Sequence, residues 1–170
     1  MTSEITHFDG GCTCQYVRYR LLALPLFVHC CHCYWCQRET GSAFALNALI
    51  EINRMQLLQG DVTIMNTPTA GSGQQKIARC PRCHVALWSH YRGAGKAISF
   101  VRVGTLDTPS CISPDIHIYT PSKQPWVTLP PETPAVLKSY KIDSPWPKES
   151  LERRAIAMKS KDATIKMPAT

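Results

Sequence analysis

Three thiols fall within six residues in the stretch Cys31-His32-Cys33-Tyr34-Trp35-Cys36-Gln37-Arg38-Glu39-Thr40-Gly41. In an extended chain Cys31 and Cys33 point to the same face, because strand side chains alternate with a period of two. A C-x-x-C turn brings the sulfurs of Cys33 and Cys36 together, so three thiolates can surround one zinc ion at about 2.3 Å. A structural tetrahedral site needs four ligands. Either another residue closes this site, or its fourth position is open to water or substrate.

Two further cysteine pairs have metal-ligand spacing. Cys12 and Cys14 follow a Gly-Gly turn, and Cys80 and Cys83 form a C-P-x-C turn between two strand-like runs. Neither pair has a third ligand nearby in the sequence, so pairing them gives a closed four-thiolate zinc site that contributes directly to folding. The alternative is a redox dithiol at Cys80 and Cys83, but no thioredoxin-like βαβ pattern surrounds them.

The chain has nine cysteines, and two of them stand outside these groups. Cys30 directly precedes the three-thiol cluster, and Cys111 stands alone, so we predict that Cys111 is a spare thiol. An odd cysteine count favours metal sites with spare thiols over a disulfide framework. The clustered cysteines could instead be ordinary buried small side chains, but the repeated spacing argues against that alternative.

The composition is that of one globular domain. The chain has 170 residues, of which 44% are hydrophobic and 18% are charged. No apolar run approaches the roughly 20 residues of a membrane span. The N-terminal residues 1–7 lack the basic-then-apolar layout of a signal peptide. We therefore expect a cytoplasmic protein with no membrane partner.

The formal net charge of +7 raises the question of a nucleic-acid partner. Zinc ions bound by four and by three thiolates would lower the effective charge to about +4. Aromatic residues make up only 8% of the chain, and no basic–aromatic interleaving is present. We expect no nucleic-acid partner. A zinc-stabilised interaction or nucleic-acid-binding module without catalysis is the alternative to an enzyme.

Alternating side chains predict a mainly β fold. The segment 75–89 has the strand–knuckle–strand layout of a zinc-ribbon hairpin. Residues 55–61 are interpreted as a short polar connection, and residues 67–73 as a loop, because glycine and proline interrupt the pattern there. Further strands are predicted at 13–21, 42–50, 62–66, 97–103 and 112–119.

Beyond Trp126 the chain becomes proline-rich, with prolines at 130, 131, 134, 145 and 147. Residues 150–160 are predicted to form a short basic helix with Leu151, Ala155 and Met158 on one side. A solvated tail that drapes over the domain is favoured over a partner-binding helix. We accordingly divide the chain into a zinc-binding domain, 1–130, and a C-terminal extension, 131–170.

Five motifs stand in order along the chain: Gly10-Gly11-Cys12-Thr13-Cys14, Val17-Arg18-Tyr19, Cys31-His32-Cys33-Tyr34-Trp35-Cys36-Gln37-Arg38, Gly41-Ser42-Ala43-Phe44 and Cys80-Pro81-Arg82-Cys83. Together they resemble the glutathione-dependent formaldehyde-activating enzyme family, which includes the centromere protein V group. The resemblance covers roughly residues 8–128. It implies a tent-like arrangement of small antiparallel sheets braced by zinc.

The resemblance also implies an activity and two zinc ions. One zinc would be structural, and the second would be more labile and accept a thiol substrate. The family makes or breaks carbon–sulfur bonds, in the founding case joining glutathione to formaldehyde as S-(hydroxymethyl)glutathione. We therefore expect a zinc-dependent carbon–sulfur lyase with glutathione or a similar thiol as partner. The implied ligands are Cys12, Cys14, Cys80 and Cys83 for the structural zinc and Cys31, Cys33 and Cys36 for the catalytic one.

Four residues outside the ligand sets also have predicted roles. Arg38 is a candidate for holding an anionic substrate or balancing the thiolates. His32 is expected to point away from the metal, as a supporting or exposed group. His117 and Trp126 resemble residues near the pocket of family members, and a core tryptophan is the alternative for Trp126.

The sequence departs from the family pattern at two knuckle positions. Gln15 and His84 stand where glycine is usual, and glycine there would allow a positive φ angle. A methionine sulfoxide reductase could share such a zinc-braced fold. Its catalytic residue would have to be Cys111, and the sequence around Cys111 does not resemble that site.

Overall fold

The computed structural model describes residues 7–69, 73–160 and 164–167. Within these residues the fold is mainly β, with a three-stranded and a seven-stranded sheet. The strands are β1 (Phe8–Gly11), β2 (Arg18–Leu21), β3 (Phe27–Cys31), β4 (Ala45–Glu51), β5 (Met55–Gln59), β6 (Thr63–Pro68), β7 (Gln74–Arg79), β8 (Ala86–Tyr91), β9 (Ile98–Arg102) and β10 (Ile116–Ile118). The helices are α1 (Tyr34–Thr40), α2 (Lys148–Lys159) and the 3-10 turns η1 (Ile52–Arg54), η3 (Val103–Thr105), η4 (Pro109–Cys111) and η5 (Thr120–Ser122).

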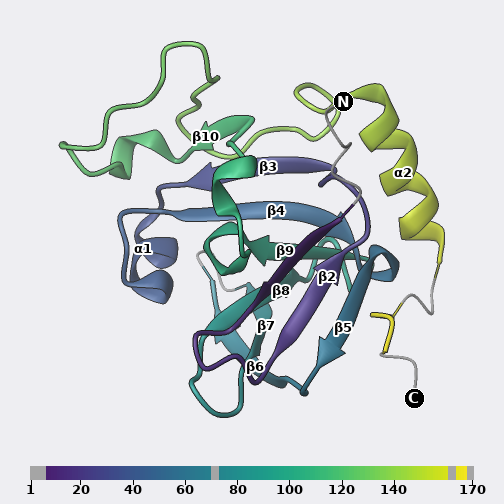
Figure 1. Cartoon of the computed structure of the whole chain (residues 1–170). Helices are drawn as coiled ribbons and strands as arrows, with labels where there is room; N and C mark the ends of the chain where they lie inside the picture. Colours follow the sequence, from purple (N-terminus) through teal and green to yellow (C-terminus); the bar gives the residue numbers. More distant parts are fainter. Residues whose placement is uncertain (1–6, 70–72, 161–163, 168–170) are drawn as a thin grey trace, which may run out of the picture.

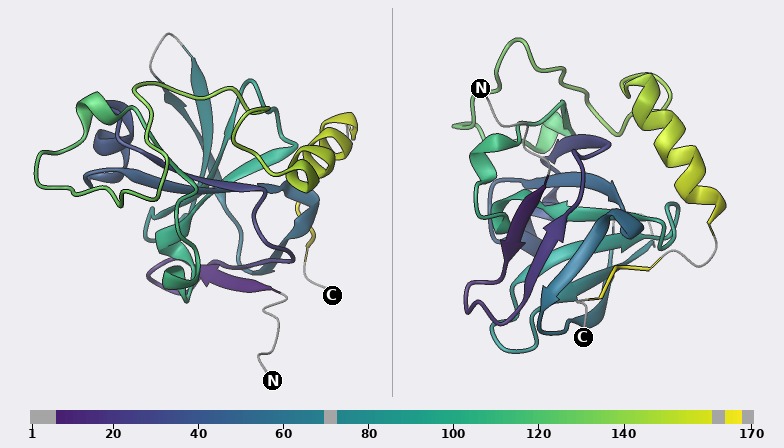
Figure 2. Two further views of the ribbon diagram at one scale, coloured as in Figure 1. Left: turned by 90° about the horizontal axis from the view of Figure 1, so that it is seen from above. Right: turned by 45° about the vertical axis from the view of Figure 1, so that its right-hand side comes forward.

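The two sheets differ in their strand pairing. The smaller sheet has the order β1-β2-β5 and is antiparallel, whereas the larger has the order β10-β3-β4-β9-β8-β7-β6. Strand β10 pairs with β3 in parallel, with His117 opposite Cys30. The larger sheet is therefore mixed, and the expected set of small antiparallel sheets is correct only in part. The smaller sheet crosses over the larger one, and α1 and α2 lie at opposite ends of the molecule (Figures 1 and 2).

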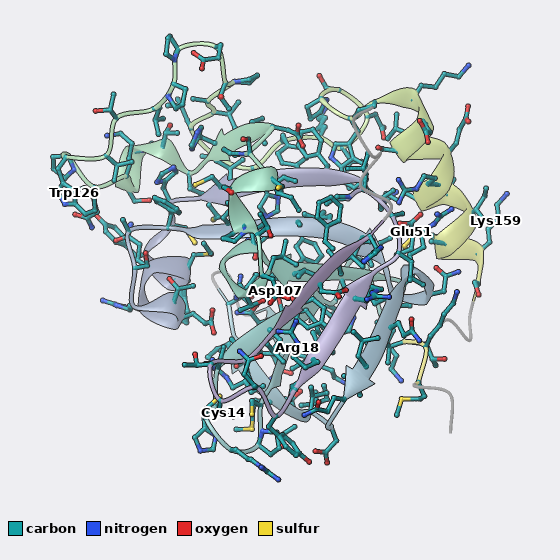
Figure 3. The ribbon with its side chains drawn as sticks, viewed as in Figure 1. Cys14, Arg18, Glu51, Asp107, Trp126 and Lys159 are labelled. Atoms are coloured by element: carbon teal, nitrogen blue, oxygen red, sulfur yellow. The ribbon has the colours of Figure 1, made fainter. Side chains whose placement is uncertain are left out.

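Strand β2 shows why the sheets pack together. Its alternation puts Tyr19 and Leu21 in the core and leaves Arg18 and Arg20 at the surface, as predicted. The Tyr19 ring meets Trp88 of β8 edge-on, with centroids 5.6 Å apart. Arg18 forms a bidentate ion pair with Asp107, which lies next to it in Figure 3. The Tyr19–Trp88 contact joins the small sheet to the large one, and the Arg18–Asp107 pair ties the small sheet to the segment after η3.

The predicted hairpin is present, because β7 and β8 pair antiparallel around the C-P-x-C turn. The strands predicted at 42–50, 62–66 and 97–103 correspond to β4, β6 and β9. The predicted polar connection at 55–61 is wrong, because most of it is β5. Met55 and Leu57 alternate into the core there and pair with β2. Only 116–118 of the predicted extended run 112–119 is a strand, where β10 pairs with β3.

The predicted C-terminal helix is confirmed as α2, but its buried face differs from the expected one. Ser150 and Ala157 are buried, whereas Ala155 and Met158 are exposed. The preceding segment also contributes to the core, since Trp146 is only 5% exposed and stacks on Phe27 of β3. Residues beyond 130 therefore pack against the same apolar cluster that contains Cys31.

Candidate metal centres and their cavity

The four thiols of the distant pairs meet at one point. The sulfurs of Cys12, Cys14, Cys80 and Cys83 all lie within 4.8 Å of one another. The Cys12–Cys14 and Cys14–Cys80 sulfur separations are 3.5 and 3.7 Å. Tetrahedral thiolates around zinc lie about 3.8 Å apart. The four thiols and their spacing therefore fit one zinc ion in a closed, four-ligand site.

Two matching turns present these sulfurs. In the first, the amide of Cys12 donates to the carbonyl of Val17 at 3.1 Å, and in the second Cys80 donates to Val85 at the same distance. Backbone amides also donate to sulfur: Val17 to Cys12 at 3.3 Å and Arg82 to Cys80 at 3.4 Å. Such bonds stabilise thiolates, which is the form that binds metal.

The residues that replace glycine adopt the strained conformation that glycine would accommodate. Gln15 and His84 both have φ angles of 61°. Across the two turns, the guanidinium of Arg82 lies 3.8 Å from the centroid of the Tyr16 ring. The Tyr16 hydroxyl donates to Asp61 at 2.5 Å. Side-chain contacts therefore support the two cysteine turns, each of which has a non-glycine residue with a left-handed backbone conformation.

The three-thiol cluster forms where β3 ends and α1 begins. Cys33 is the N-cap of α1 in an extended conformation, and its sulfur accepts the amide of Cys36 at 3.4 Å. The sulfurs of Cys31, Cys33 and Cys36 lie within 4.8 Å of one another. The extended step between the first two cysteines is as predicted, but the sequence did not predict a helix after it. Three thiols in this arrangement fit a zinc ion with one further position.

The three sulfurs share their protons unequally. Hydrogen bonds from Cys31 and then Cys36 hold the pKa of Cys33 at about 2. The Cys33 thiolate in turn raises the pKa of Cys31 to about 12, and the pKa of Cys36 is also raised, chiefly by Cys31. The hydrogen bonds among the three sulfurs thus favour the ionised form at Cys33, and a bound cation would stabilise the ionised form of all three.

A cavity of about 300 Å³ adjoins this cluster, and all three cysteines line it. Tyr91 of β8 and Phe100 of β9 form an aromatic wall, with ring centroids 4.7 Å apart in an edge-to-face arrangement. Further lining residues are His29, Trp35, Thr69, Ile118, Tyr119 and Ser139. Burial lowers the pKa of His29 to about 4, with Arg102 acting in the same direction. His29 is therefore neutral at pH 7.

The charged lining residues Glu39 and Arg102 belong to one ion-pair network with Arg79. The Glu39 carboxylate accepts from Arg102 and from Arg79, each at 2.6 Å. Arg102 also donates to the Asn47 side chain. Two buried polar atoms of the lining have no hydrogen-bond partner among the described residues, namely the Gln75 Oε1 acceptor and the Arg102 Nε donor. None of these residues had a motif in the sequence, except that Glu39 follows the cysteine cluster.

A third group lies on the opposite face of β3. His32 Nε2 is 3.0 Å from His117 Nδ1 and 3.6 Å from the sulfur of Cys30. All three residues are buried. The donor atoms of the three residues lie within 4.8 Å of one another, so this group could itself hold a metal ion. His32 is not exposed, and its expected supporting role stays a prediction. Burial lowers the pKa of His32 to about 4, with His117 and Lys123 adding to the effect, so the ring is neutral and the imidazole pair is joined by one hydrogen bond.

Three other candidates lie away from the cavity lining. Arg38 is exposed on α1 and does not line the cavity. Trp126 is 74% exposed at the outer tip of a loop, so the alternative of a core tryptophan is wrong (Figure 3). Cys111 is exposed on η4, and among the described residues it belongs to no candidate metal cluster.

The fold and its side-chain clusters define a class: a mainly β protein whose described residues form three candidate metal groups. One is the closed four-cysteine group, one is the three-cysteine group beside the cavity, and one is the buried group of Cys30, His32 and His117. A family model described as "glutathione-dependent formaldehyde-activating enzyme" matches residues 7–122. The chain belongs to this family, which indicates an enzyme of the formaldehyde-activating type at the family level.

The chain was also compared with solved structures and with curated proteins. A crystal structure of a Rhodobacter sphaeroides protein is similar over 58% of this chain and 87% of that chain, with 21% identity and a TM-score of 0.43. No curated protein matches the chain. Among the described residues, no helix combines the length and apolar character needed to cross a membrane.

Proposed function

We propose that this protein is a zinc-dependent carbon–sulfur lyase that makes or breaks a thiol–formaldehyde adduct of the S-(hydroxymethyl)glutathione type. The observation that carries the proposal is the gathering of Cys31, Cys33 and Cys36 at the edge of one cavity of about 300 Å³. Three ligands from protein leave a position for a substrate sulfur, as a catalytic zinc site requires. The closed four-cysteine cluster would hold a second zinc with a structural role.

The reaction is balanced without a redox partner. In the forward direction the sulfur of R–SH attacks the carbon of formaldehyde, the C–S bond forms, the carbonyl π bond breaks, and the thiol proton ends on the new hydroxyl. When bound, zinc lowers the pKa of a coordinated thiol, so that sulfur is a nucleophile at neutral pH.

The residues of the chain would hold the cation, shield the reacting sulfur from water and form hydrogen bonds with the substrate. Cys31, Cys33 and Cys36 hold the cation, and the Tyr91–Phe100 wall limits the access of water to the reacting sulfur. The unpaired Arg102 Nε can donate to the oxygen on which negative charge develops. Gln75 Oε1 can accept from the product hydroxyl.

The test is the rate of exchange between formaldehyde hydrate and its thiol adduct, followed by NMR exchange spectroscopy with ¹³C-labelled formaldehyde. Zinc-loaded protein should raise this rate above that of buffer, whereas Cys36→Ser should not. Cys111→Ser is the matched control and should behave as the parent protein, because Cys111 lies outside both clusters. No acceleration by any thiol, together with salt-dependent binding to DNA or RNA, would favour the non-catalytic module instead.

A further inference from the structure

His29 of β3 lies on the face of the large sheet that carries the three-cysteine cavity. It stands two residues before Cys31, so both side chains point to one face of the strand. Across the sheet, His29 is opposite Asn47 of β4, and Asn47 is opposite Arg102 of β9. All four residues line the cavity of about 300 Å³. The row of paired positions therefore places the His29 ring and the Arg102 side chain on the same side of the sheet.

The C-terminal segment provides a hydrogen bond to the His29 ring. The hydroxyl oxygen of Tyr140 lies 3.2 Å from His29 Nδ1. The backbone of residues 134–136 exchanges hydrogen bonds with His117 of β10 at 2.8 and 2.9 Å, which fixes this segment beside the sheet. The Tyr140 ring also meets the Phe27 ring edge-on, with centroids 5.4 Å apart. The family match ends at residue 122, so Tyr140 lies outside the region that defines the family.

The hydrogen bonds at the Tyr140 hydroxyl have a fixed direction. Trp146 Nε1 lies 3.4 Å from the Tyr140 oxygen, and an indole N–H can only donate. The Tyr140 oxygen therefore accepts from Trp146, and its own O–H is free to donate to His29 Nδ1. If His29 Nδ1 were the donor, the Tyr140 O–H would have no acceptor among the described residues. His29 Nδ1 is thus the bare nitrogen, and the ring carries its proton on Nε2.

The His29 Nε2–H group is a free donor at the cavity. Within the part of the chain that the structure describes, Nε2 forms no hydrogen bond, yet it does not belong to the buried polar atoms without partners. It is therefore accessible from the cavity that His29 lines. Arg102 Nε is a second donor without a partner in the same row. Two strand spacings of about 4.8 Å separate the two residues, so their side chains can reach one small group from two sides.

We propose that His29 Nε2–H donates a hydrogen bond to the formaldehyde-derived oxygen, and that Tyr140 is the positioning residue that holds His29 in this tautomer. The inference rests on the proposed function, because this oxygen belongs to the thiol adduct made or broken at the three-cysteine site. As the thiol sulfur attacks, negative charge develops on the carbonyl oxygen, and a donor that is already oriented stabilises it without reorganisation. His29 keeps its proton throughout, because the proton of the new hydroxyl is the one that the thiol loses.

The first experiment determines the tautomer of His29 by ¹H–¹⁵N NMR of the zinc-loaded full chain at pH 7, without added thiol. Triple-resonance spectra of ¹³C,¹⁵N-labelled protein assign the ring through its bonds to the backbone. The parent protein should show a bare Nδ1 and a protonated Nε2 at His29. Tyr140→Phe keeps the ring beside Phe27 and removes the hydroxyl, so His29 should become a mixture of both tautomers.

The second experiment measures the rate of formaldehyde–thiol exchange with the same proteins. Tyr140→Phe should lower the acceleration about tenfold, as expected for a group that orients another. His29→Leu should lower it about a hundredfold, as expected for one lost donor to a developing oxyanion. Tyr34→Phe is the matched control, because Tyr34 is exposed on α1 and does not line the cavity. It should match the parent protein in both experiments, and zinc content and melting temperature are recorded for every variant.

The two readouts separate this inference from the proposed function. If Tyr140→Phe keeps either the tautomer or the exchange rate of the parent protein, the inference is wrong and the proposed function stands. A parent His29 that carries its proton on Nδ1 overturns the inference in the same way. If the parent protein accelerates exchange with no thiol, the proposed function fails, and the inference fails with it. The tautomer is read on the parent protein, so this test holds even if His29→Leu does not fold.

Discussion

Replacement of Cys80 by serine tests the closed centre most directly. Cys80 is fully buried, and its sulfur lies 3.7 Å from that of Cys14. Serine is nearly the same size, so the change leaves no large cavity, but its neutral hydroxyl is a poor zinc ligand. We expect the Cys80→Ser protein to lose one zinc ion per chain and to unfold more easily.

The size of the expected loss of stability follows from the segments that the four-cysteine centre joins. It ties the turn between β1 and β2 to the turn between β7 and β8, which come from different sheets. Structural zinc contributes roughly 10 kcal/mol or more, against a total stability of about 5–15 kcal/mol for a domain. Loss of even half of that contribution, about 5 kcal/mol, would lower the melting temperature of a chain of this length by about 15 °C.

The assay combines zinc content per chain with thermal unfolding followed by circular dichroism. Cys111→Ser is the control, because it changes an exposed cysteine outside the described metal clusters. It should keep both the zinc content and the melting temperature of the parent protein. If Cys80→Ser retained full zinc content and an unchanged melting temperature, the assignment of the structural centre would be refuted.

Three further changes test other parts of the structure. Cys36→Ser should remove one zinc ion per chain and leave the melting temperature within a few degrees of the parent, because the closed four-cysteine centre is separate. Metal analysis measures the zinc content, and calorimetry measures the melting temperature. His90 has its pKa lowered to about 4, first by burial and then by Lys96 and Lys76. At His90 the unfolded chain therefore binds more protons than the folded one between pH 6.5 and 4, so this histidine alone should lower stability by up to about 3 kcal/mol as pH drops through that window. His29 and His32, whose pKa values are also lowered to about 4, add to the same fall. Urea unfolding should show a smaller fall in His90→Gln, and an equal fall would contradict the assignment. Arg153 of α2 donates to both oxygens of the buried Glu51 carboxylate at 2.7 and 2.9 Å, so Arg153→Ala should cost about 2 kcal/mol in urea unfolding; no loss would show that α2 does not depend on this pair.

The parts of the fold that could be predicted are those with a local sequence pattern. Strand β2 and the β7–β8 hairpin were predicted because their alternation and turn residues act over a few neighbouring positions. Strand β5 was missed because the short alternation of Met55 and Leu57 is masked by polar neighbours, and only pairing with β2 makes it a strand. The start of α1 was missed because Cys33 supplies the cap through its sulfur, which is not among the usual capping side chains.

The sequence by itself determined which cysteines form groups. A C-x-C or C-x-x-C spacing restricts two sulfurs to one side of a turn, so the members of each pair follow from covalent connectivity. The sequence could also suggest, but not fix, that Cys12 and Cys14 join Cys80 and Cys83, because that contact spans 66 residues from Cys14 to Cys80.

The tertiary structure alone decided the chemistry of the cavity. Its walls come from α1, from strands β3, β4, β7, β8, β9 and β10, and from the C-terminal segment, and no sequence pattern links all of these segments. The sequence around Arg102 does not indicate that its guanidinium pairs with Glu39. It also does not indicate that Arg102 Nε has no hydrogen-bond partner among the described residues. The physical reason is that the environment of a buried polar group depends on which distant side chains pack around it. That packing is set by the register of the whole sheet, which local spacing does not encode.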